Sequence, residues 1–374
     1  MRNLIILVTV TLFLLASSHN NSDPVTQYSG SVNQLDSFLI SKPELILSFH
    51  HPVPEIKLAY KSYRGDFEEW KKVAKQKFSE LISYESPVNR EVTVLRKKEI
   101  DGIVYHAMVM KVSEDLSIPA YLLEPAGEIR GAVMAIHGHG SVEPMIGLRD
   151  DYHHKFAYEL AKSGFVVIAP ELRGFSTLSD LAEQVPIARL DYWVSNSHYT
   201  LVTDGFLYGK TLIGQTIEDL IAWEEWFFKH FDFENLSVAG ISYGGDLALY
   251  YPVFSKRVSK IFCSGSLGSF SLIFSRCYNA PAHAIPGILK WLDRSDIAGL
   301  NVPRPILLHY GELDYPSEKN ASASYNESVG VSVEEIKEIY AQEGAESYIE
   351  MKVTSGKKHE MDVDLLLSFM TGKN

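Results

Sequence analysis

Residues 236–250, LSVAGISYGGDLALY, contain the pattern on which the interpretation of this chain depends. An apolar run leads into Ser242, and glycines stand two residues before and after that serine, at Gly240 and Gly244. This G-x-S-x-G pattern is typical of a nucleophile elbow, a sharp strand-to-helix turn that exposes a serine hydroxyl at the end of a sheet. The glycines let strand and helix pass closely, and the helix N-terminus favours developing negative charge. We therefore predict that Ser242 is a nucleophile; the alternative is a surface serine in an ordinary tight turn.

The composition is that of a globular protein. The chain has 374 residues, of which 46% are hydrophobic and 22% are charged, enough for one large domain or one domain with an extension. The formal net charge of -12 argues against nucleic acid or an anionic membrane surface as a partner. The sequence does not indicate an oligomeric state.

The first 18 residues have the pattern of a secretory signal peptide. A basic start, Met1-Arg2-Asn3, precedes an apolar run over 4–15 and then small residues. The run is shorter than the ~20 residues that span a bilayer, which favours cleavage over an uncleaved membrane anchor. We expect a secreted or periplasmic protein that does not bind a membrane after cleavage. Export would permit a disulfide between Cys263 and Cys277, although two free buried thiols are the favoured interpretation.

Residues 19–89 are predicted to form an N-terminal helical extension packed on a main domain of residues 90–374. A helix begins after Asp66, a plausible N-cap. Apolar residues then recur at helical spacing: Phe67, Trp70, Val73, Phe78 and Leu81. This segment is too short and too helical to hold a core of its own.

The main domain alternates strand and helix patterns. Strands are predicted near 91–95, 105–112 and 118–124 as an antiparallel start, followed by buried strands near 131–136, 165–170, 236–241, 258–263, 305–310 and 348–353. Strands that alternate with helices in this way form βαβ units, and these predict a mostly parallel sheet with helices on both faces. Between 175 and 209 this pattern fails, and the many aromatic residues there favour an ordered loop over a site.

A serine nucleophile needs a base and a group that orients the base. Asp314 and His359 each follow a predicted strand, in the chain order serine, acid, histidine of the α/β-hydrolase fold. Glu312 is a rival for the acid, but Asp314 lies deeper in the turn. His309 is expected to be packed within its strand, and His283 is a weaker candidate for the base.

Two backbone N–H groups are expected to form an oxyanion hole. One is that of Tyr243, directly after the nucleophile, and the other that of His139, in the His-Gly-His-Gly loop over 137–140. The imidazole of His137 is expected to brace this loop.

A metal-dependent hydrolase is the second interpretation, with a possible ligand set of His137, His139, Asp151, His153 and His154. Their spacing does not define a closed set of zinc ligands. We therefore expect no bound metal and no cofactor. A third interpretation is a non-catalytic binding protein on a hydrolase scaffold.

Several motifs together resemble the dienelactone hydrolase and acetyl xylan esterase-like branch of the α/β-hydrolase superfamily. The resemblance covers roughly residues 90–370 and includes these segments: 137-HGHG, 171-ELRG, 240-GISYGG, 305-PILLHYGELD, Cys277-Tyr-Asn with 285-IPGIL, and the late His359.

The resemblance implies a serine esterase with nucleophile Ser242, acid Asp314 and base His359. Members of this branch often remove acetyl or other small acyl groups from carbohydrates, so a small-molecule or carbohydrate ester is the implied substrate. Dienelactone hydrolases proper often use cysteine, and the serine here favours an ordinary carboxylic ester. A serine peptidase of the same superfamily is the alternative, although no propeller-like segment precedes the hydrolase part. The acyl group and the alcohol stay open, because the loop over 175–209 is the part least like the family.

Overall fold

The computed structural model describes residues 55–87, 90–177, 197–270, 281–314 and 321–372. The chain divides into one unit of residues 1–53 and another of residues 54–374, and the second unit contains all the described residues. The predicted signal peptide therefore lies outside the described residues, as do Cys277 and most of the predicted loop over 175–209.

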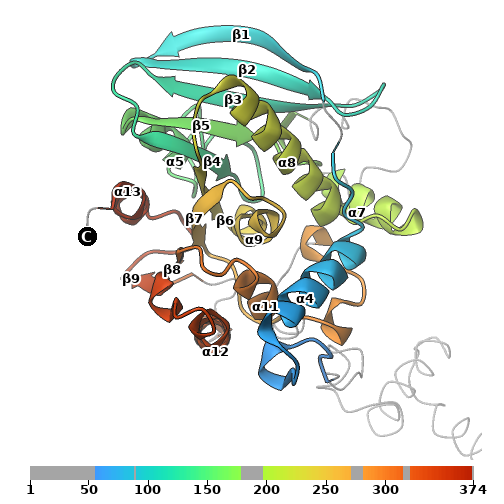
Figure 1. Ribbon diagram of the computed structural model, residues 1–374. Coiled ribbons are helices and arrows are strands. Elements are labelled where there is room, and N and C mark those ends of the chain that lie inside the picture. The colour runs from blue at the N-terminus through green and yellow to red at the C-terminus, as the bar shows by residue number, and fades with distance from the viewer. Residues whose placement is uncertain (1–54, 88–89, 178–196, 271–280, 315–320, 373–374) are drawn as a thin grey trace, which may run out of the picture. The chain divides into compact units, whose positions relative to one another are not determined.

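One sheet dominates the described part of the chain (Figure 1). Its nine strands are β1 (Val92–Ile100), β2 (Ile103–Lys111), β3 (Ser117–Pro125), β4 (Gly131–Ile136), β5 (Phe165–Pro170), β6 (Leu236–Ile241), β7 (Val258–Ser264), β8 (Ile306–Gly311) and β9 (Ile349–Thr354). Their order is β1-β2-β3-β5-β4-β6-β7-β8-β9. The pairs from β1 to β5 are antiparallel and the pairs from β5 through β4 to β9 are parallel. The predicted α/β fold with a mostly parallel sheet is confirmed.

Helices cover both faces of this sheet (Figure 1). On one face lie α5 (Phe156–Lys162) and α13 (Val363–Thr371). On the other lie α4 (Phe67–Ile82), α8 (Leu212–His230), α9 (Tyr243–Tyr250), α11 (Arg294–Gly299) and α12 (Ala321–Ala341). Successive residues of the central strands point to alternate faces: on β4, Ala132, Met134 and Ile136 join one core, and Val133 and Ala135 join the other. This double burial is why the parallel strands are apolar throughout.

Helix α4 packs on the same unit, as the sequence predicts. The Asp66 side chain accepts hydrogen bonds from the N–H groups of Glu68 and Glu69, at 2.9 and 3.1 Å, which confirms the N-cap. The buried stripe comprises Trp70, Ala74, Phe78 and Ile82. Phe67 and Leu81 are half-buried and pack against the same core, and Val73 is half-buried, because the most buried positions recur at every fourth residue. The boundary at residue 89 stays a prediction.

The expectation of a continuous irregular loop over 175–209 was wrong in its last third. Residues Ser197–Leu207 form helix α7. The segment carries threonine, valine, aspartate and glycine, all of low helix propensity, and only tertiary packing makes it helical. Helix α12 was also missed, for a similar reason, since its first half is rich in serine and asparagine.

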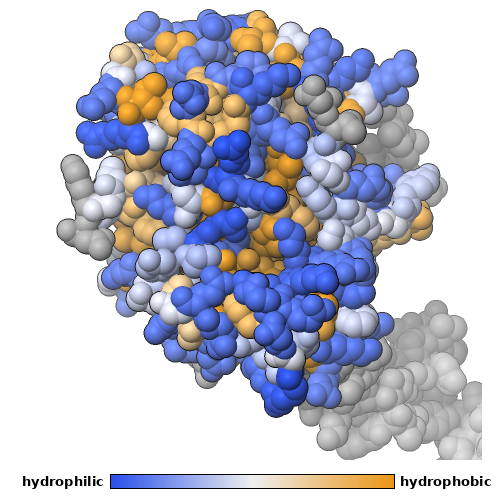
Figure 2. Space-filling view, in the orientation of Figure 1, coloured by the Kyte–Doolittle hydropathy of each residue, from blue (hydrophilic) through white to orange (hydrophobic). Residues whose placement is uncertain are grey.

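The outer strand β1 is protected against further pairing by its charges. Most of its residues are exposed, and they include Arg96, Lys97, Lys98 and Glu99, as expected for an edge strand. Hydrophilic side chains cover most of the face seen in Figure 2, whereas the upper edge, where β1 lies, shows hydrophilic and hydrophobic side chains together. Strand β1 also exposes Val94 and Leu95. None of the helices in the described ranges is long and apolar enough to cross a membrane.

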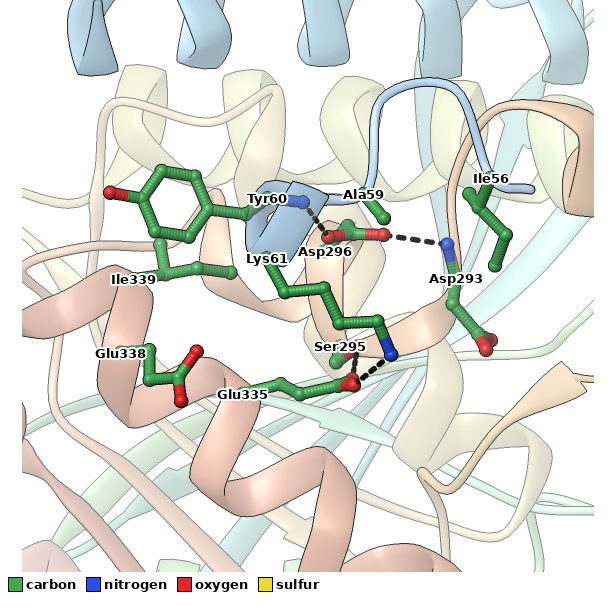
Figure 3. Close-up of a pocket in the computed structure, with 10 residues that line it drawn as sticks. All are labelled: Ile56, Ala59, Tyr60, Lys61, Asp293, Ser295, Asp296, Glu335, Glu338 and Ile339. Atoms are coloured by element: carbon green, nitrogen blue, oxygen red, sulfur yellow. Dashed lines mark hydrogen bonds and ion pairs between the residues drawn. The ribbon is translucent and has the colours of Figure 1, made fainter. Parts of the chain in front are cut away.

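A small acidic pocket joins the segment before α4 to the rest of the unit (Figure 3). The carboxylate of Asp296 accepts hydrogen bonds from the N–H groups of Tyr60, at 2.9 Å, and Asp293, at 2.8 Å. Lys61 pairs with Glu335 at 2.6 Å. Burial, and secondarily the neighbouring Asp293 and Glu335, raises the pKa of Asp296 to about 7.

Because of this raised pKa, the contribution of Asp296 to the free energy of unfolding is expected to fall as pH rises. An acid whose pKa is raised by folding stabilises the folded state most when both states are protonated, here below its ordinary pKa near 3.8. That contribution is lost as pH rises towards 7, by at most ~1.4 kcal/mol per pH unit. Urea unfolding of wild type and Asp296→Asn between pH 4 and 8 measures the effect. The variant should show a smaller decrease with pH, whereas the exposed Asp150→Asn should follow wild type; parallel curves for wild type and Asp296→Asn would contradict the prediction.

Candidate active site

Ser242 occupies the turn between β6 and α9 in a strained conformation. Its φ is 58° and its ψ is -124°, a region in which a non-glycine residue costs about 1–3 kcal/mol. Its N–H donates to the carbonyl of Ser264 at 2.9 Å, and its carbonyl accepts from the N–H groups of Gly245 and Asp246. Within residues 236–253 every residue except the half-buried Ser242 is buried. The turn therefore presents one side chain, a serine hydroxyl, at the carboxyl end of β6.

The two glycines around Ser242 are required by close backbone contact. A Cβ atom on Gly240 would lie 2.0 Å from the carbonyl oxygen of Gly244, and one on Gly244 would lie 2.3 Å from that of Ile136. Any side chain at either position would displace the helix from the sheet. The predicted close passage of strand and helix is confirmed.

Asp314 and His359 meet at the same edge of the sheet. The two residues follow β8 and β9, and His359 Nδ1 lies 2.8 Å from Asp314 Oδ1. The Asp314 side chain is 6% exposed and the His359 side chain is 39% exposed. The buried carboxylate can accept the Nδ1 proton, which leaves the more exposed Nε2 as the basic nitrogen. This is the carboxylate–imidazole pairing that orients a general base.

The rival acid Glu312 is oriented elsewhere. Its carboxylate accepts hydrogen bonds from the Ser355 hydroxyl at 2.7 Å and the Gly356 N–H at 2.8 Å. It therefore stabilises the turn after β9 and is not the carboxylate that the structure pairs with His359.

Gly265 connects the serine to the Asp–His pair. The preceding residue, Ser264, holds the backbone N–H of Ser242. Gly265 itself has φ +57°, and a Cβ atom there would lie 2.7 Å from His359 Cε1 and 3.1 Å from Asp314 Oδ2. The end of β7 and the residue after it thus border both the elbow and the imidazole, so the three predicted residues come to the same sheet edge.

Two histidines brace the loop after β4. The N–H of Leu172 donates to His137 Nε2 at 3.0 Å, and His137 Nδ1 lies 2.7 Å from the carbonyl of Gly138. The N–H of Gly138 donates to His153 Nε2 at 2.9 Å, and His153 Nδ1 lies 2.7 Å from Asp151. Burial lowers the pKa of His137 to about 3, so it is neutral at physiological pH. The expected bracing role of His137 agrees with these bonds.

Tyr152 links this loop to the histidine loop, and sequence reasoning missed it. Its hydroxyl donates to the carbonyl of His139 at 2.6 Å, its carbonyl accepts from the N–H of Met361 at 2.9 Å, and its ring lies 5.5 Å from that of His359. Burial raises the pKa of Tyr152, which keeps it a phenol. Around Tyr152, the sequence predicts only Asp151, His153 and His154 as possible metal ligands.

The metal hypothesis finds little support in these contacts. Both ring nitrogens of His137 and of His153 make hydrogen bonds within the protein. His154 turns to Glu360, with Nε2 at 2.5 Å from the carboxylate. In the ranges that the structure describes, no three candidate ligand side chains gather as a metal site would require.

The proposed oxyanion donors lie close to Ser242. Helix α9 begins at Tyr243, and the first N–H groups of a helix have no partner within it. In the loop after β4, the N–H of Gly138 is already donated to His153. A Cβ atom on Gly138 would lie 3.0 Å from Ser242 Cβ, so this loop borders the serine. The roles of Tyr243 and His139 stay predictions.

The remaining candidates from the sequence are buried. His309 has Nδ1 2.8 Å from the Ser264 hydroxyl and Nε2 3.2 Å from that of Thr354, so it is bonded within the sheet as expected. His283 pairs with Asp246 at 2.5 Å. Cys263 is a free buried thiol, and burial raises its pKa.

The pairing of Asp314 rather than Glu312 with the base gives a direct test. Asp314→Asn should lower the rate of Ser242 modification by a fluorophosphonate by about 10²-fold or more, because the amide no longer holds the imidazole in the required tautomer. Glu312→Gln is the matched control and should stay within about twofold of wild type, as expected for an exposed turn residue. Equal losses in both variants would contradict the assignment. Intact mass and the melting temperature check that both proteins are folded.

Comparisons with known proteins agree with this architecture. A family model described as alpha/beta hydrolase fold matches residues 132–286. A search of curated proteins finds no significant match. One similar solved structure is a candidate acetyl xylan esterase from Bacteroides fragilis, with 15% identity and a TM-score of 0.66, and the match covers 85% of this chain and 83% of that chain. A glucuronoyl esterase from Solibacter usitatus has 11% identity and a TM-score of 0.58, with 86% of this chain and 98% of that chain covered. A carbohydrate esterase family 15 glucuronoyl esterase from Caldicellulosiruptor kristjansonii has 18% identity and a TM-score of 0.52, with 86% of this chain and 91% of that chain covered.

At these identities the likeness concerns the fold and does not extend to substrates. The matched segment begins within β4 and includes the elbow, the part of the fold that carries the serine. The chain has the α/β-hydrolase fold, and residues 132–286 match the family model of that fold.

Proposed function

We propose that the protein is a serine esterase that hydrolyses small acyl esters, with Ser242 as nucleophile, His359 as base and Asp314 as the acid that orients it. The observation that carries this proposal is the strained, partly exposed Ser242 at the β6–α9 turn, at the same sheet edge as a His–Asp pair 2.8 Å apart. Strain of this kind persists only where the surrounding structure maintains it, and it is common at reactive sites.

The proposed reaction passes through an acyl-enzyme. His359 Nε2 takes the proton of Ser242 as the serine oxygen attacks the ester carbonyl, and the tetrahedral oxyanion accepts hydrogen bonds from the N–H groups of Tyr243 and His139. The protonated imidazole then gives its proton to the leaving alcohol. In the second half, His359 activates water, the acyl group is released as a carboxylic acid, and Ser242 recovers its proton. Asp314 stabilises the imidazolium in both halves.

An acyl group of acetyl size on a carbohydrate is the proposed substrate class. The support is of two kinds. The resemblance of the motifs is to the dienelactone hydrolase and acetyl xylan esterase-like branch. The solved structures of similar fold are named as esterases, one a candidate acetyl xylan esterase and two glucuronoyl esterases.

An ester panel tests the substrate class and the nucleophile together. We expect wild type to hydrolyse p-nitrophenyl acetate and acetylated sugars faster than p-nitrophenyl esters of longer chains. Ser242→Ala should lose about 10⁴-fold or more of kcat, because the acyl-enzyme cannot form.

Ser259→Ala is the control, since Ser259 is a half-buried serine on β7 whose hydroxyl bonds the carbonyl of Leu236. It should keep wild-type turnover. A preference for long chains would overturn the acetyl proposal, and undiminished turnover by Ser242→Ala would overturn the nucleophile.

We also propose that the protein is exported, on the basis of the basic and apolar pattern of residues 1–18. Expression of the full chain in a bacterial host and N-terminal sequencing of the processed protein test this. The expected result is a mature N-terminus near residue 19, in the periplasm or medium. A variant with Leu7→Arg and Leu12→Arg interrupts the apolar run and should leave the precursor uncleaved; an intact Met1 in wild type would contradict the proposal.

A further inference from the structure

Behind the predicted oxyanion hole lies a buried polar group that the proposed mechanism does not use. It consists of Asp246 in the first turn of α9, His283 in the 3-10 helix Pro281–His283, and Arg294 at the start of α11. The exposed fractions of their side chains are 1%, 11% and 3%. The three residues come from three separate segments, so the group ties those segments together.

The group is closely hydrogen-bonded. The Asp246 carboxylate binds His283 Nδ1 at 2.5 Å, forms an ion pair with Arg294 and accepts a hydrogen bond from the Ser266 hydroxyl. The guanidinium of Arg294 also donates to the Ser266 hydroxyl at 3.0 Å and the carbonyl of Leu267 at 3.1 Å. Burial lowers the pKa of His283 to about 3, so this imidazole is neutral. The negative charge of Asp246 is then balanced by the positive charge of Arg294.

A buried ion pair is weak evidence for stability, because its desolvation offsets its attraction. Its geometry, however, is well defined. His283 Nδ1 donates to a carboxylate that Arg294 and Ser266 hold in place, so that end of the imidazole ring is anchored to a fixed group. A histidine held in this way can transmit a fixed orientation to whatever its ring contacts.

The ring of His283 contacts the two residues proposed as oxyanion donors. It stacks on His139, with centroids 5.3 Å apart and an interplanar angle of 21°. It meets Tyr243 edge to face, at 5.0 Å and 71°. His139 and Tyr243 also contact each other at 5.6 Å, and Phe175 lies 5.4 Å from the former and 5.8 Å from the latter. These four rings, His139, Phe175, Tyr243 and His283, form the oxyanion-side aromatic cluster.

We propose that His283, oriented by Asp246 and Arg294, is a positioning residue that sets the relative placement of the His139 and Tyr243 backbones in the oxyanion hole. The two donors belong to different segments, the loop after β4 and the first turn of α9, and their N–H groups must converge on one oxygen. A small misplacement weakens such a site strongly, because oxyanion donors act only at the correct distance. This role rests on the ester hydrolysis proposed above.

Two substitutions at position 283 separate the ring from its hydrogen bond. His283→Asn keeps an N–H donor for Asp246 but removes the ring from the cluster. His283→Phe keeps a ring but loses the donor. The matched control is His106→Asn, which changes another buried histidine paired with a carboxylate, Glu124 at 2.7 Å, on the antiparallel strands β2 and β3.

The measurements compare transition-state and ground-state recognition. For p-nitrophenyl acetate, kcat and KM are determined. Inhibition constants are determined for an alkyl trifluoromethyl ketone, which forms an oxyanion on the serine, and for the methyl ketone of the same chain, which stays a carbonyl. Far-UV circular dichroism and melting temperatures show that each variant is folded.

We expect His283→Asn to lower kcat about tenfold or more with KM changed less than about threefold, since the lost interaction acts in the transition state. The inhibition constant for the trifluoromethyl ketone should rise by a similar factor, and that for the methyl ketone should not. His283→Phe should recover part of kcat, and His106→Asn should lower only the melting temperature.

The inference is overturned if His283→Asn keeps kcat within about twofold of wild type. It is equally overturned if the two ketones lose affinity alike, since that would indicate a general disturbance of the pocket. Failure of the proposed function looks different: wild type would not hydrolyse the ester, or Ser242→Ala would hydrolyse it equally well, and the positioning role would fail with it.

Discussion

The site depends on one backbone constraint, the strained turn at Ser242. A residue with φ 58° cannot continue either the strand before it or the helix after it. The turn is maintained because β6 is buried on both faces and α9 is buried along its length, and because the two glycines let the chain segments touch. Packing energy from both cores therefore holds a conformation that the local sequence would not adopt alone.

Everything else in the site is arranged around that turn by hydrogen bonds between loops. Ser264 holds the Ser242 backbone, and the next residue, Gly265, borders His359 and Asp314. Tyr152 joins the loop after β4 to the histidine loop through its hydroxyl and its carbonyl. Loops built in this way keep reactive groups at fixed positions while a rigid sheet supports them.

Sequence patterns were most informative where burial imposes a strict period. The double burial of the parallel strands and the cap at Asp66 could be inferred, because each follows from local chemistry. Helices α7 and α12 could not, since residues of low helix propensity hide them until tertiary contacts form. The contacts of Tyr152, His153 and His283 were also missed, although an aspartate such as Asp246 inside an otherwise apolar helix is a signal that a buried partner exists.

The sequence by itself determined the fold class, because burial imposes the strand and helix periods. It also predicted a serine, an acid and a histidine in the chain order typical of α/β-hydrolases, from the G-x-S-x-G motif and the residues that follow the later strands. Only the tertiary structure decided which side chains meet. The choice of Asp314 over Glu312 beside His359, and the orientation of His283 by Asp246 and Arg294, depend on distances between segments far apart in sequence. Residue spacing does not specify such distances, because they are set by how the loops pack at the sheet edge.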